Sequence, residues 1–141
     1  MSLLASVPLF ERCSKRDLAK IGSIAQEVEY PDGTMVVREG DPGSELFIIV
    51  HGEVDVRSGA RKLATLRAGT YFGEIALITG SPRTATVTTG TPVRALVITG
   101  RAFRKLLKDS PEIQFKVLQE VGERLEERSS RRQPQRIRLR N

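Results

Sequence analysis

The segment from Phe72 to Val87, FGEIALITGSPRTATV, contains a carboxylate and an arginine nine positions apart, Glu74 and Arg83. Arginine offers a planar fork of donors that fits two phosphate oxygens, whereas a carboxylate only accepts hydrogen bonds. Glu74 would therefore repel a phosphate but suits a hydroxyl group beside it. Together the two side chains predict a ligand that carries an anion next to a hydroxyl, as a small sugar phosphate does.

The residues around this pair predict how the chain brings it together. Gly73 lets the backbone approach a ligand closely, and the apolar run 75–78 predicts about one to two helical turns, whose first amides lack internal partners and attract anions. The turn residues 80–82 reverse the chain, and the alternation over 83–89 predicts a half-buried strand. The arginine is thus expected to return toward the carboxylate. An ordinary surface ion pair is the alternative for two such residues.

The whole segment closely resembles the phosphate-binding cassette of the cyclic nucleotide-binding domain family, which includes catabolite activator protein, the regulatory subunits of protein kinase A and the cyclic-nucleotide-gated channels. A second segment, VVREGDPGSELFIIVHGEVDV over 36–56, resembles the glycine-punctuated strand pair that precedes this cassette. The resemblance extends from about Val7 to about Arg128. It implies that the ligand is cAMP, with cGMP possible, and that no other cofactor, metal or catalytic residue is needed.

The resemblance also implies residue roles. Arg83 would take the cyclic phosphate and Glu74 the ribose 2′-hydroxyl. The remaining expected ligand contacts fall into four groups: backbone amides at Gly73, Ile75 and Ala76; neighbours of the phosphate at Thr84 and Ala85; apolar walls at Val56, Leu66 and Phe72; and Arg124 over the purine, on a C-terminal helix that closes as a ligand-responsive lid. The three wall residues could equally be ordinary core.

The turn and strand pattern predicts a mainly β fold with flanking helices. Ser14 and Asp17 predict a capped helix through Ala25, after which glycine-rich turns separate short strands at regular spacing. A last strand over 93–99, a helix over 101–108 and a long helix from Pro111 follow. We expect a jelly-roll-like β-roll, a double-stranded β-helix of about eight strands, with an N-terminal helix and C-terminal helices.

The charge distribution divides the chain in two. The net charge is +6, but residues 128–141 hold six arginines and no acid, so residues 1–127 are balanced at 17 basic and 17 acidic side chains. We expect a cyclic nucleotide-binding domain over residues 1–128 and a basic disordered tail or linker over 129–141. The single cysteine and the absence of a long apolar run favour a cytoplasmic location without membrane insertion.

A metal site and nucleic-acid binding can each be tested against the residue types that they require. A cupin-like metal site needs a cluster of imidazoles, and the sequence has one histidine, His51. No helix-turn-helix pattern follows the long helix, so nucleic acid is an improbable partner except weakly through the tail. Two alternatives stay open: a degenerate cassette that serves as a dimerisation or docking module, and a nucleic-acid accessory that acts through the tail. The effector that responds to the ligand is unknown, and a homo-oligomer is possible.

Overall fold

The computed structural model describes residues 3–132, apart from the side chains of Ile75, Ile78 and residues 124–132. Within that range the elements are the short helices η1 (Leu3–Ser6) and η2 (Pro8–Phe10), helices α1 (Lys15–Ser23), α2 (Glu74–Thr79), α3 (Gly100–Asp109) and α4 (Pro111–Arg132), and strands β1 (Gln26–Tyr30), β2 (Met35–Val37), β3 (Leu46–His51), β4 (Glu53–Ser58), β5 (Arg61–Arg67), β6 (Tyr71–Phe72), β7 (Thr86–Thr89) and β8 (Val93–Ile98). The eight strands confirm the predicted mainly β fold.

The strands form two four-stranded antiparallel sheets, in the orders β1-β8-β3-β6 and β2-β7-β4-β5. Side chains from both sheets enclose one buried cluster, made of Ile49, Val54, Val87, Val93 and Ala95. Strand β3 is almost continuously buried because it lies inside the first sheet between β8 and β6. The buried Val54 of β4 and Val87 of β7 supply the facing side.

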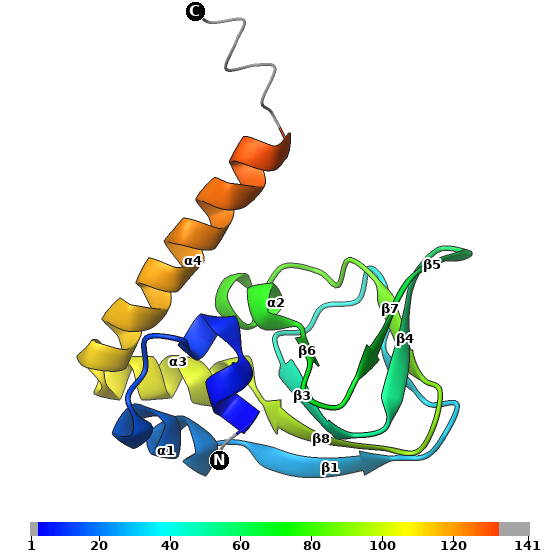
Figure 1. Cartoon of the computed structure of the whole chain (residues 1–141), viewed down its shortest axis with the longest axis horizontal. Helices are drawn as coiled ribbons and strands as arrows, with labels where there is room; N and C mark the ends of the chain where they lie inside the picture. The colour runs from blue at the N-terminus through cyan, green and yellow to red at the C-terminus, as the bar shows by residue number, and fades with distance from the viewer. Residues whose placement is uncertain (1–2, 133–141) are drawn as a thin grey trace, which may run out of the picture.

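The helices gather at one end of the β-roll, and α4 extends away from it (Figure 1). A second buried cluster joins them to the first sheet and includes Leu77 of α2, Phe103 of α3 and Ile113 and Val117 of α4. The base of α4 is also fastened by ion pairs. Lys116 donates to Asp17 at 2.6 Å, and Arg12 pairs with Glu120 and Glu123.

Several local predictions are confirmed and three boundaries differ. Ser14 and Asp17 form the reciprocal capping box of α1, but the helix ends at Ser23 rather than Ala25 because β1 begins at Gln26. Strand β7 begins at Thr86 rather than at Arg83. Helix α4 continues to Arg132, past the expected domain boundary at residue 128, and the rest of the expected tail lies outside the described residues.

Candidate ligand-binding site

The cassette starts where β6 turns into α2. Gly73 is the residue before the helix and has φ of 90°, a left-handed conformation that glycine adopts without strain. A Cβ atom at Gly73 would also overlap the carbonyl oxygen of Glu45 and lie 2.9 Å from Arg83 Nη1. Gly80, with φ of 70°, ends the helix and donates to the carbonyl of Ala76 at 2.8 Å. Two glycines therefore define a six-residue helix that starts beside the arginine.

A cavity of about 250 Å³ opens between this helix and the second sheet. Eight of the predicted site residues line it: Val56, Phe72, Gly73, Glu74, Ala76, Arg83, Thr84 and Ala85. The fold thus brings the predicted carboxylate and the predicted arginine to one cavity.

Three predicted residues, Leu66, Ile75 and Arg124, are not among the described residues that line this cavity. Leu66 is not among the described lining residues; it packs against the cluster between the two sheets. Val56 and Phe72 pack against that same cluster and also line the cavity, so for them core packing and wall position coincide. Ile75 lies in α2 and Arg124 in α4, but their side chains fall outside the described part of the chain.

Arg83 is the most enclosed polar group of the site, with a side chain only 6% exposed. Its Nη2 donates to Glu45 Oε1 at 2.8 Å and its Nη1 to the Glu45 carbonyl at 3.2 Å. The guanidinium carbon lies 5.7 Å from the centre of the Phe47 ring, and that ring stacks on Phe72 at 4.7 Å. A buried guanidinium requires such partners because an unpaired charge is costly to remove from water.

Sequence reasoning missed part of this arrangement. Val37, Ser81, Pro82 and Val87 also line the cavity, and Glu45 supplies the carboxylate bound to the arginine. Glu45 stands 38 positions before Arg83, immediately ahead of the buried strand β3. The sequence held only a general indication of this pair. An arginine beside a core strand needs a counter-ion, and the loop before that strand contains acidic residues.

A second cavity adjoins the first and is larger, about 510 Å³. It shares Val37 and Arg83 with the cassette cavity, and its other lining residues are Tyr30, Met35, Val36, Arg38, Asp41, Pro42, Glu45, Phe47 and Val97. Arg83 therefore lies at the boundary between two cavities. Glu74 lines the cassette cavity, and Glu45 lines the larger one.

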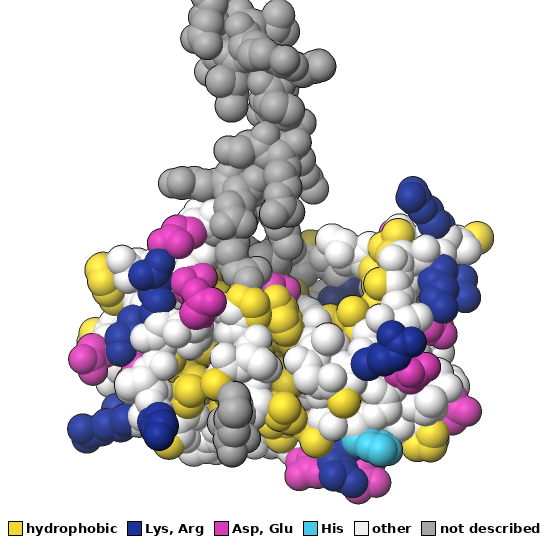
Figure 2. All heavy atoms as spheres, viewed as in Figure 1, with side chains coloured by type: hydrophobic (Ala, Val, Ile, Leu, Met, Phe, Trp, Pro, Cys, Tyr) yellow, Lys and Arg dark blue, Asp and Glu magenta, His cyan; other side chains and the backbone are white. Residues whose placement is uncertain are grey.

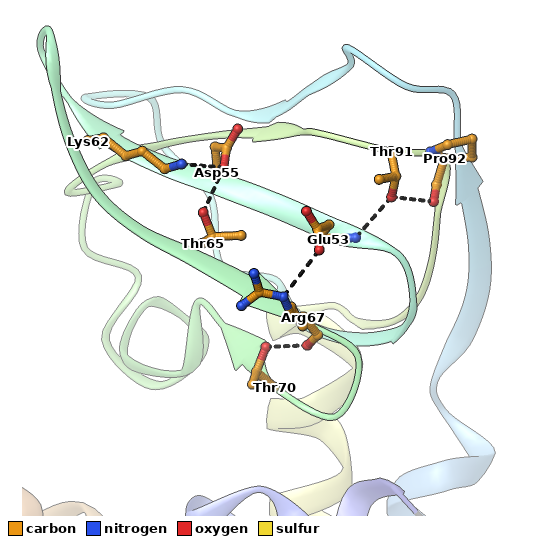
Figure 3. Close-up of polar contacts among 8 residues, drawn as sticks. All are labelled: Glu53, Asp55, Lys62, Thr65, Arg67, Thr70, Thr91 and Pro92. Atoms are coloured by element: carbon orange, nitrogen blue, oxygen red, sulfur yellow. Dashed lines mark hydrogen bonds and ion pairs between the residues drawn. The ribbon is translucent and has the colours of Figure 1, made fainter.

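The β4–β5 hairpin that positions Val56 is held in register by polar pairs on its outer face (Figure 3). Asp55 accepts from Thr65 at 3.0 Å and pairs with Lys62 at 3.3 Å, while Arg67 pairs with Glu53 at 3.2 Å. The Thr65 hydrogen bond, followed by that of Lys62, lowers the pKa of Asp55. With these polar residues outside, Val54 is buried and Val56 faces the cassette.

One face of the molecule shows how the charged side chains are distributed. On the face in Figure 2, basic and acidic side chains are interspersed rather than gathered by sign. Among the described residues no three His, Cys, Asp or Glu side chains form a group that could hold a metal ion. No described helix combines the length and the apolar character needed to cross a membrane.

The comparisons with known proteins agree with this geometry. The model of the family described as "Cyclic nucleotide-binding domain" matches residues 27–110, which include both sheets except Gln26, the helices α2 and α3, and the whole cassette. The chain belongs to the cyclic nucleotide-binding domain family. The predicted family and the predicted jelly-roll-like fold are thereby confirmed.

Relatives of this cyclic nucleotide-binding domain include regulatory proteins and channels. It is 42% identical over 113 residues to a cAMP-dependent protein kinase regulatory subunit of Mycosarcoma maydis, covering 74% of this chain and 22% of the relative. It is 38% identical over 111 residues to a cyclic nucleotide-gated potassium channel of Mesorhizobium japonicum, covering 79% of this chain and 31% of the channel. The chain therefore spans about a fifth to a third of these relatives' length.

Solved structures place the same domain in transcriptional regulators. The N-terminal domain of a transcriptional regulator from Streptomyces coelicolor A3(2) superposes with a TM-score of 0.85 at 28% identity, over 90% of this chain and 94% of that one. The catabolite activator protein of Thermus thermophilus gives 0.71 at 25% identity, over 86% of this chain and 60% of the other. The domain is thus of a regulatory type that occurs beside different effectors.

Proposed function

We propose that this domain is a non-catalytic sensor that binds cAMP, and also cGMP, in the cassette cavity. The observation that carries the proposal is the buried Arg83 lining one cavity with Glu74 and the start of α2. A cyclic phosphate is a compact monoanion with two free oxygens, which a guanidinium fork can hold. Glu74 in the same cavity would accept a hydrogen bond from the ribose 2′-hydroxyl.

The remaining cassette residues would complete the ligand shell. The backbone amides of Gly73, Ile75 and Ala76 lie at the start of a helix, where amide hydrogens lack acceptors within the helix. Thr84 and Ala85 directly follow the arginine and would lie beside the phosphate.

The apolar walls would receive the sugar and base. Val56 and Phe72 line the cavity, and Leu66 lies next to Val54 across the β4–β5 pair. Stacking and apolar contact do not distinguish strongly between purines, so we expect both nucleotides to bind. cAMP should be modestly preferred, because no acidic side chain can be assigned to the guanine edge.

The size of the cavity supports a closing element. Its volume of about 250 Å³ lies below the roughly 300–1,000 Å³ usual for pockets that enclose a small ligand. A nucleotide would leave part of its base outside, and α4 would act as a ligand-responsive lid that places Arg124 over the purine. Ligand binding would then shift the population of α4 positions.

We further propose that the sensing unit spans residues 1–128 in a cytoplasmic protein and controls an effector outside this chain. The relatives named above attach the domain to a kinase regulatory subunit, a potassium channel and transcriptional regulators. These relatives differ in kind, so the effector here is a separate question from the ligand.

Titration calorimetry of the purified chain tests the ligand. We expect heat and a single site for cAMP and cGMP, and much weaker binding of 5′-AMP, whose open phosphate carries an additional charge and lacks the ring geometry. An absence of binding by both cyclic nucleotides at millimolar concentration would contradict the proposal. A preference for 5′-AMP would show that the arginine serves a different phosphate.

One observation favours a second candidate, a dimerisation or docking module. Phe115 and Leu118 on α4 are 64% and 53% exposed, although both are large and apolar. They lie on the flank of α4 away from the buried Ile113 and Val117. Sedimentation of the chain with and without cAMP separates the two candidates: a dimer that forms equally in both conditions, without nucleotide binding, would favour the module.

A further inference from the structure

The loop from Gly40 to Glu45 wraps around Arg83 on the side of the larger cavity. The Arg83 amide donates to the carbonyl of Asp41 at 2.9 Å, and the Gly40 amide donates to the carbonyl of Arg83 at 2.8 Å. Gly43 packs so closely that a Cβ atom there would lie 2.8 Å from Arg83 Nε. The loop therefore fixes both the backbone and the side chain of the arginine.

Glu45 binds this enclosed guanidinium through two different acceptors, its carbonyl and its carboxylate. The two partners differ in exposure: the arginine side chain is 6% exposed and the glutamate side chain 42%. The cation is thus almost removed from water, whereas its counter-ion remains half in solvent. Loss of the counter-ion would strand a buried charge, but loss of the cation would leave a carboxylate that water can still solvate.

We propose that Glu45 is an intramolecular counter-ion that competes with the cyclic phosphate for Arg83 and so lowers the affinity of the cassette. The inference rests on the proposed function of the site. An arginine has five donor hydrogens, and a bidentate anion uses two of them on neighbouring nitrogens. Because Nη1 and Nη2 already donate to Glu45, a phosphate must either share the guanidinium with a like-charged carboxylate or displace it.

The larger cavity gives the displaced carboxylate a place to go. Glu45 lines that cavity together with Tyr30, Arg38 and Asp41. Its charge already acts there, since burial and then the charge of Glu45 raise the pKa of Tyr30. A half-exposed side chain at the rim of a cavity of about 510 Å³ can rotate into water without unpacking the core.

The opposite role, in which Glu45 only positions the arginine for the phosphate, predicts the opposite sign. If Glu45 is a competitor, removing its charge destabilises the protein without nucleotide more than the complex, so affinity rises. If Glu45 is a positioning residue, the same change releases the guanidinium and affinity falls. The sign of the affinity change therefore decides between them.

The test is Glu45→Gln, which keeps the size and one acceptor of the side chain and removes its charge. We expect cAMP to bind about 1.5-fold to fivefold tighter by calorimetry, the range for an ion pair that is partly exposed. The melting temperature without nucleotide should fall, and the stabilisation by a fixed cAMP concentration should grow. Glu27→Gln is the matched control: it removes the same charge from an exposed pair with Arg94, which lines neither cavity, and should leave affinity unchanged.

The outcomes separate this inference from the proposed function. If wild type binds cAMP and Glu45→Gln binds it equally or more weakly, the competition is refuted while the cassette assignment stands. If wild type binds neither cyclic nucleotide, the proposed function fails and this inference fails with it. Should Glu45→Gln not fold, Glu45→Asp retains the charge with a shorter reach. It should bind cAMP slightly tighter than wild type, and weaker binding would equally refute the competition.

Discussion

Replacing Arg83 by alanine is the most direct perturbation of the cassette. The substitution removes two hydrogen bonds to Glu45, at 2.8 and 3.2 Å, and the cation that lies over the Phe47 ring. It also removes the group proposed to hold the cyclic phosphate. Binding and stability should therefore respond differently, because the two functions of the side chain have different partners.

The affinity loss should be large. Truncating one partner of an enclosed charge pair costs about 2–5 kcal/mol, which corresponds to roughly 30-fold to several thousand-fold in affinity. The stability loss should be smaller, because Glu45 is half-exposed and regains water when its partner is removed. A loss of about 1–2 kcal/mol would lower the melting temperature of a domain of this size by a few degrees, with the fold intact.

Calorimetry with cAMP measures the first quantity and thermal melting without ligand the second. Cyclic AMP at about 100 times its dissociation constant should stabilise wild type by roughly 2.7 kcal/mol, and Arg83→Ala should lose nearly all of this shift. Arg83→Lys is the matched control: it retains the charge without the bidentate fork and should fall between the two. Unchanged affinity in Arg83→Ala, with a normal melting curve, would refute the cassette assignment.

Three further predictions use the same assays. Glu74→Ala should weaken cAMP less than the arginine change and should also reduce discrimination against 2′-deoxy-cAMP; full discrimination in that variant would remove the 2′-hydroxyl role. Arg124→Ala should weaken the binding of both nucleotides by about 1 kcal/mol or more, and affinities equal to those of wild type would refute the lid. Thr84→Ala should weaken cGMP more than cAMP, and an equal loss for the two nucleotides would refute the base contact. The hydrogen bond from Lys116 is the largest of the causes that lower the pKa of Asp17. The ionised Asp17 therefore stabilises the fold above about pH 4, and this contribution is lost as the pH falls through the lowered pKa of the folded state. Acid melting curves of Asp17→Asn should accordingly depend less on pH below 4 than those of wild type.

Local sequence signals predicted the parts of the fold that short segments determine. The capping box of Ser14 and Asp17 needs only four residues, and the start of α4 at Pro111 follows from a serine and a proline. Strand β1 was not anticipated, because Gln26–Tyr30 is largely polar and becomes a strand by pairing with β8, far along the chain. Its conformation is decided by the partner rather than by its own pattern.

The start of β7 shows the same limit at the site. Alternation of apolar and polar residues extends back to Arg83, but the strand begins at Thr86. At Arg83 the backbone amide and carbonyl bond to Asp41 and Gly40 instead of a strand partner. The sequence thus predicted that the arginine and Glu74 share a cavity, since both lie in one short segment. It could not predict Glu45, because that contact depends on how a distant loop folds back.

The packing around Leu77 explains how a nucleotide could act on α4. Leu77 is fully buried and lies three residues after Glu74, in the cluster that also contains Ile113 and Val117 of α4. Because protein cores are close-packed, a shift of α2 toward a bound phosphate would press on its neighbours in this cluster, which include Phe103 of α3 as well as the base of α4. The ion pair between Arg12 and Glu123 opposes such a movement only weakly, since both side chains are more than a third exposed. Helix α4 packs mainly against η2 and α3, and the nearly buried carboxylates of Asp17 and Glu120 also hold its base through Lys116 and Arg12. The proposed lid movement would therefore have to reach α4 through α3 and to loosen these two ion pairs.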